Sequence, residues 1–99
     1  MDDAEALRRL DALDFLAFQA EHSPLSHGRL KLPIADFDFL MATIGANATS
    51  HQAQIDAISE RTLPLANQVN LPLDGFKSLL WIAHEAVQSV SVDEAVQRG

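Results

Sequence analysis

The sequence predicts an all-α protein, a small bundle of three to four helices with one long central helix that assembles as a dimer. Composition predicts the helices: the chain has 15 Ala and 14 Leu among 99 residues, against 13 Val, Ile and Thr together. Small and straight-chain side chains lose less rotamer freedom in a helix than β-branched ones. Gly and Pro, which interrupt helices, number four each. A heptad repeat of apolar residues in the middle of the chain predicts the long helix and the dimer.

Length and charge limit the classes of function. A chain of 99 residues, 47% of them hydrophobic, is expected to form a single helical domain over residues 1–99. Its formal net charge of -7 argues against binding nucleic acid or anionic lipid by charge. Without cysteine, no disulfide or cysteine-ligated metal is expected. The acidic N-terminus and the short apolar runs predict a cytoplasmic protein of bacterial type.

The first helix is expected over about residues 3–21. Asp3 and Glu5 lie in its first turn, where carboxylates stabilise the helix dipole. Its apolar residues repeat at helical spacing and are Leu7, Leu10, Leu13, Leu16, Ala17 and Ala20. Phe15 and Phe18 widen this face, so the helix carries more apolar surface than one contact needs.

Two connecting segments are expected to lack regular structure. Residues 22–33 contain Pro24, Gly28 and Pro33 and predict a solvated loop. Residues 70–75 (NLPLDG) predict a turn into the next helix.

The long helix is expected over about residues 34–63. Apolar residues recur there at alternating spacings of three and four, and His51 occupies one position of this repeat. The middle of this segment, residues 45–54, contains no large apolar side chain, and Thr49 with Gln52 forms a capping box that could start a new helix. We therefore predict one continuous helix, with a break near Asn47 as the alternative.

The last third of the chain predicts a helix over about residues 75–90 and a short helix over about residues 92–98. Asp74 is the expected N-cap of the first of these helices. Ser91 with Glu94 forms a capping box that predicts the start of the second.

The length of the central helix predicts a homodimer. About 30 helical residues span ~45 Å, which exceeds the ~33 Å diameter of a compact chain of this size. The flanking helices are too short to cover the whole heptad seam, so a second copy is expected to cover it. The predicted dimer interface consists of Ile34, Phe37, Met41, Ile44, His51, Ile55 and Ile58.

The histidines do not form a recognisable metal motif. No two of the four histidines have the i, i+4 spacing of helical zinc ligands. His84-Glu85 begins like a zinc-protease motif, but Gln88 stands where the second histidine belongs. His51 falls on the heptad seam, where a polar residue typically fixes register. A small-ligand or metal-binding helical protein that uses His51 and His84 is the alternative function.

The acidic pairs have simple structural interpretations. Asp36 and Asp38 cannot share a helix face and are expected to stabilise the start of the long helix. Asp11 and Asp14 are expected to lie on a solvated helix edge. Neither a G-x-S-x-G elbow nor a glycine-rich phosphate loop is present. We therefore predict no catalytic, metal or cofactor-binding residues, and the chain is not expected to be an enzyme.

The remaining apolar surface predicts a protein partner. Exposed aromatic rings typically anchor protein interfaces, and the expected partner-binding residues are Phe15, Phe18, Trp81 and Ile82. The predicted function is a non-enzymatic regulator that binds and inhibits or modulates another protein, such as a transcription activator. An acidic inhibitor of phage type or a DNA mimic is a further alternative, although the acids are spread evenly along the chain.

Overall fold

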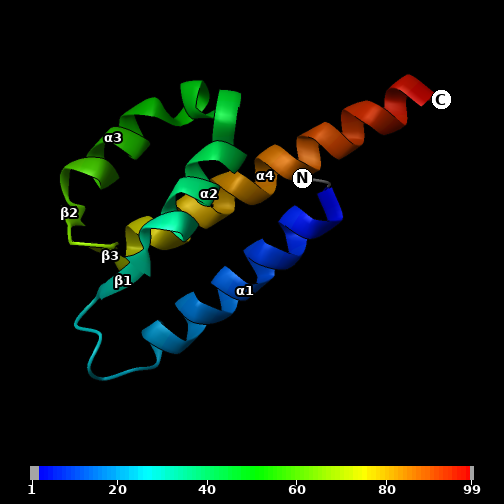
Figure 1. Cartoon of the computed structure of the whole chain (residues 1–99). Coiled ribbons are helices and arrows are strands. Elements are labelled where there is room, and N and C mark those ends of the chain that lie inside the picture. Colours follow the sequence, from blue (N-terminus) through cyan, green and yellow to red (C-terminus); the bar gives the residue numbers. More distant parts are fainter. Residues whose placement is uncertain (1–2, 99) are drawn as a thin grey trace.

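The structure, a computed structural model, describes the backbone of residues 3–98 and the side chains of residues 4–45 and 47–88. It combines helices with a three-stranded antiparallel sheet (Figure 1). The helices are α1 (Asp3–Glu21), α2 (Ile34–Ile44), the 3-10 helix η1 (Gly45–His51), α3 (Gln52–Glu60) and α4 (Leu73–Arg98). The strands are β1 (Arg29–Pro33), β2 (Leu63–Pro64) and β3 (Gln68–Pro72). The prediction of an all-α fold is therefore wrong.

The sheet replaces two segments that were expected to be a loop and a turn. The strand order is β1-β3-β2, so β3 is the central strand, and it pairs with β1 through Leu32 opposite Val69 and Leu30 opposite Leu71. These four side chains alternate with polar ones, and Leu32, Val69 and Leu71 are buried. Proline, which cannot donate to a ladder, is tolerated because it occupies the last position of each strand.

The predicted helix over residues 34–63 is interrupted, close to the position of the alternative break. α2 ends at Ile44, and Gly45 follows with a φ of 49°, a positive value that glycine adopts without steric cost. The next residues form η1, whose side chains offer little apolar surface to hold a regular α-helix against the core. The heptad spacing of the apolar residues continues across the break, but these residues belong to two separate helices, α2 and α3.

α4 is one helix where two were expected. It spans Leu73–Arg98, so its backbone is helical across the boundary predicted between residues 90 and 92. No Gly or Pro lies between Phe76 and Arg98, so no residue in that stretch forces a helix to end. The side chains of the Ser91–Glu94 capping box lie outside the described side chains.

The core forms where α4 packs against α1, α2 and the sheet. α1 and α4 run antiparallel side by side, and the sheet lies at the end of the molecule where α1 ends and α4 begins (Figure 1). α1 spans the range expected from the sequence and buries Ala6, Leu10, Leu13, Ala17 and Ala20. α4 approaches α3 closely at Gly75, because a Cβ there would lie 2.9 Å from Cγ2 of Ile58.

Within the described residues, none of the helices combines the length and the apolar character that crossing a lipid bilayer requires.

Candidate functional site

The structure separates the four predicted partner-binding residues. The side chains of Phe15, Phe18 and Trp81 are 60%, 57% and 62% exposed, whereas Ile82 is fully buried. Ile82 was misplaced because α4 packs against α1, α2 and β3 at once, so more than one of its faces is covered. Three large aromatic rings are therefore available to a partner, and Ile82 belongs to the core.

Phe18 and Trp81 line the same cavity between α1 and α4, of about 290 Å³. We call this cavity the α1–α4 groove. It is lined by Asp14, Ala17, Phe18 and Glu21 of α1 and by Lys77, Leu80, Trp81 and His84 of α4. Both sets follow the i, i+3, i+4, i+7 spacing of a single helix face. Ala17 and Leu80 are buried and the two aromatic rings are exposed, so the groove has an apolar floor and aromatic walls.

Two polar pairs join the helices on either side of these apolar residues. Nζ of Lys77 lies 3.1 Å from Oε1 of Glu21, and Nε2 of His84 lies 2.7 Å from Oδ2 of Asp14. Their side chains are between a quarter and a half exposed, and pairs of this kind contribute about 0–1 kcal/mol to stability. They fix the relative position of α1 and α4 more than they stabilise the fold.

His51 and Glu85 support the indole ring of Trp81. The His51 and Trp81 rings meet edge to face, with centroids 6.0 Å apart. Nε2 of His51 lies 3.5 Å from Oε2 of Glu85, one turn along α4 from Trp81. His51, at the end of η1, therefore contacts α4 of its own chain. The sequence pattern placed His51 in a dimer interface instead and did not reveal this contact.

Phe15 lies on a different side of α1. It lines a second cavity between α1 and α2, together with Arg9 and Asp36. The guanidinium of Arg9 is 3.7 Å from Oδ1 of Asp36 and stacks 3.9 Å from the centre of the Phe39 ring. Asp36 thus has a structural role as the partner of Arg9. Phe15 is an exposed aromatic residue that does not line the α1–α4 groove.

A third cavity, of about 420 Å³, lies between the end of α1, the following loop and β1. Arg29 and Asn70 are among its lining residues. Arg29 donates from Nε to Oδ1 of Asn70 at 2.6 Å, and from a terminal nitrogen to the carbonyl oxygens of Arg61 at 2.7 Å and of Asn70 at 3.0 Å. Because these bonds join β1, β3 and the end of α3, they account for Arg29 as a structural residue.

The residues of the predicted dimer interface do not form one exposed seam. Ile44, Ile55 and Ile58 are buried in the core of their own chain, so they cannot contact a second copy in this fold. Phe37 and Met41 are partly buried against the core, and His51 contacts Trp81. Ile34 alone of the seven is largely exposed. The homodimer itself stays a prediction, and its predicted interface loses three of its four isoleucines.

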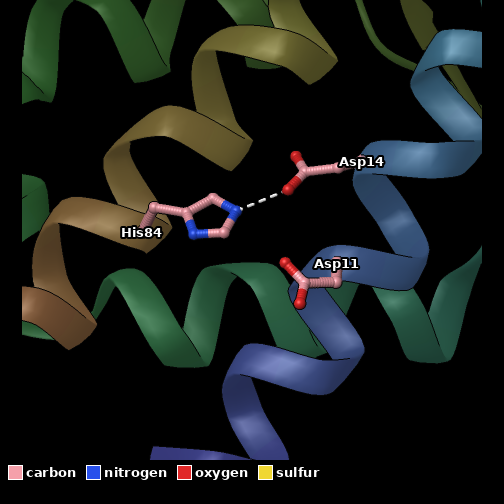
Figure 2. Close-up of side chains that lie close together, drawn as sticks. All are labelled: Asp11, Asp14 and His84. Atoms are coloured by element: carbon pink, nitrogen blue, oxygen red, sulfur yellow. Dashed lines mark hydrogen bonds and ion pairs between the residues drawn. The ribbon is translucent and has the colours of Figure 1, made fainter.

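The structure brings one group of potential metal ligands together within its described residues. This group is Asp11, Asp14 and His84, and one ligand atom of each lies within 4.8 Å of the others (Figure 2). The alternative metal site with His51 is not formed, since the nearest carboxylate to His51 is the single Glu85. Asp38 is exposed and does not join Asp36 in such a group.

Comparison with known proteins gives no match to a family model, to a curated protein or to a solved structure.

Proposed function

We propose that this chain is a non-enzymatic, cytoplasmic regulator that binds a segment of another protein in the α1–α4 groove. The observation that carries the proposal is that Phe18 and Trp81, two of the most exposed large side chains, come from different helices and line one cavity. Trp and other aromatic residues dominate the binding energy of protein interfaces, because a rigid ring buries a large area at little entropic cost.

The shape of the groove favours a helical segment as its occupant. The lining residues of α1 extend from Asp14 to Glu21, which corresponds to ~10 Å, or two helical turns. An amphipathic helix laid along such a groove inserts one or two apolar side chains between the aromatic walls. The apolar floor of Ala17 and Leu80 is suited to receive them.

Charge favours a basic occupant. Around the groove, the carboxylates of Asp14, Glu21 and the nearby Asp11 and Glu85 outnumber the single ammonium group of Lys77. The whole chain has a formal net charge of -7. Complementary charge raises association rates and excludes acidic competitors. The proposed partner segment is therefore an amphipathic helix whose apolar anchors are flanked by Lys or Arg.

The test is selection of binders from a library of displayed helical peptides, followed by titration of a labelled selected peptide. Phe18→Ala and Trp81→Ala should each weaken binding by about 30-fold, the effect of losing a hot-spot side chain. Phe15→Ala is the matched control, since it removes an equally exposed ring three residues away in α1. It should change affinity by less than about threefold, and all three variants should melt close to wild type because exposed positions contribute little to stability.

Three results would contradict this function. The library could yield no peptide that binds. It could also yield only peptides whose affinity falls as much with Phe15→Ala as with Phe18→Ala. Alternatively, light scattering could show a wild-type dimer that Phe18→Ala and Trp81→Ala dissociate, in which case a second copy of the chain occupies the groove.

A further inference from the structure

The geometry of Asp11, Asp14 and His84 points to a binding site for a divalent transition-metal ion, Zn²⁺ in particular, that joins α1 to α4. Figure 2 shows the two carboxylates of α1 and the imidazole of α4 turned toward the same space between the helices. Their ligand atoms lie within 4.8 Å of one another, and the closest pair, Nε2 of His84 and Oδ2 of Asp14, is 2.7 Å apart. This inference concerns a site at one end of the α1–α4 groove and does not depend on the proposed partner.

The distances are close to those of a bound zinc ion. Zinc lies about 2.0–2.2 Å from imidazole nitrogen and carboxylate oxygen, so that neighbouring ligand atoms of a tetrahedral site are about 3.4 Å apart. Nε2 of His84 and Oδ2 of Asp14 need to separate slightly, and Asp11 needs to approach. Asp11 is exposed, and its side chain makes no hydrogen bond or ion pair among the described residues, so no such contact opposes its rotation toward His84.

The chemistry of the three ligands favours zinc over magnesium or calcium. Imidazole nitrogen suits Zn²⁺ and other later transition ions, whereas magnesium and calcium prefer oxygen ligands alone. Zn²⁺ binds Nε2 of the neutral imidazole, whose one proton then lies on Nδ1. Two carboxylates and a neutral imidazole leave a net negative charge at the site, which the cation neutralises.

Three protein ligands leave one position of a tetrahedral zinc ion open to water or to a further ligand. The site is also a cross-link: Asp11 and Asp14 are one turn apart on α1, and His84 lies in the facing turn of α4. Binding to the folded chain alone stabilises it by mass action, so zinc is expected to raise the melting temperature.

Calorimetric titration of the untagged full chain with Zn²⁺ tests the inference, without any peptide partner present. Wild type should bind one ion per chain, and Asp11→Asn, Asp14→Asn and His84→Ala should each weaken binding by about 10–100-fold or more, since even outer partners of metal ligands have effects of that size. Asp38→Asn and His27→Ala are the matched controls and should bind as wild type. Zinc should raise the melting temperature of wild type and of both controls, but not of His84→Ala.

The inference is overturned if wild type takes up no Zn²⁺, or if Asp11→Asn, which removes no hydrogen bond or ion pair among the described residues, binds it as tightly as wild type. Binding of Mg²⁺ with the same affinity as Zn²⁺ overturns it as well, because the site would then be an unselective acidic surface. None of these outcomes bears on peptide binding by Phe18 and Trp81, so the two proposals fail separately.

Discussion

Replacing Phe76 with alanine should lower the free energy of unfolding by about 3–5 kcal/mol, the usual cost of truncating a buried phenylalanine. Phe76 is fully buried in the first turns of α4 and is among the largest side chains of the core. Its removal leaves a cavity where α4 packs against the rest of the molecule. For a domain of this size, the melting temperature should fall by at least about 12 °C. Urea unfolding followed by circular dichroism measures the effect.

Phe15→Ala is the control for this prediction, because it makes the same chemical change at a ring that is mostly exposed. Its effect should stay within about 0.5 kcal/mol, as is usual for surface positions. Equal destabilisation by the two substitutions would contradict the arrangement of α1 and α4 described here.

Replacing Arg29 with methionine should lower the free energy of unfolding by about 1.5–3 kcal/mol, the range of hydrogen bonds to charged groups. The substitution keeps an apolar stem and removes the three hydrogen bonds that Arg29 donates to Asn70 and to the carbonyl of Arg61. Arg29→Lys should have an intermediate effect, because an ammonium group keeps the charge but cannot reproduce the planar fork of a guanidinium. Urea unfolding measures each difference.

Lys31→Met is the matched control in the same strand. The side chain of Lys31 is exposed and makes no hydrogen bond or ion pair among the described residues, so its replacement should change stability by less than about 0.5 kcal/mol. If Arg29→Met lowered the free energy of unfolding as little as Lys31→Met does, the conclusion that Arg29 joins β1, β3 and the end of α3 would be contradicted.

The helix α1 could be predicted from the sequence because the signals that define it are local. The periodicity from Leu7 to Ala20 and the acids in the first turn place α1 over residues 3–21, as the structure has it. The strands were missed although Arg29–Pro33 and Gln68–Pro72 both alternate polar and apolar residues. Each is only five residues long and ends in proline, and their pairing joins positions about 40 residues apart, which no local pattern reveals.

The predicted helix over residues 34–63 is too long because the heptad phase of its apolar residues is unbroken although the helix itself is interrupted. α2 and α3 each bury an apolar face in the same core, and Ile44, Ile55 and Ile58 serve that core from two helices. Phase can therefore persist across an interruption. The signal for the break was the stretch from Gly45 onward, where a glycine that tolerates positive φ precedes residues without large apolar side chains.

The candidate site was predictable in part. Exposure of Phe18 and Trp81 follows from their positions beside the apolar faces of their helices. The sets Asp14, Ala17, Phe18, Glu21 and Lys77, Leu80, Trp81, His84 share one spacing and one order of polar, apolar, aromatic and polar residues. That the two sets face each other depends on the antiparallel packing of α1 and α4. Asp11, Asp14 and His84 meet for the same reason, so a search for histidine spacing within one helix could not find them.

The most direct test of the binding surface is to map a selected peptide on the isotope-labelled protein by nuclear magnetic resonance. The chain has one tryptophan, so its side-chain N–H gives a single signal that reports on the groove. We expect this signal and those of Ala17, Phe18 and Leu80 to shift and saturate together with peptide concentration, while the signals of Phe15 and Leu25 stay in place. Shifts that gather instead around Phe15, or around the cavity lined by Arg29, with the tryptophan signal unchanged, would contradict the α1–α4 groove as the site where a partner binds.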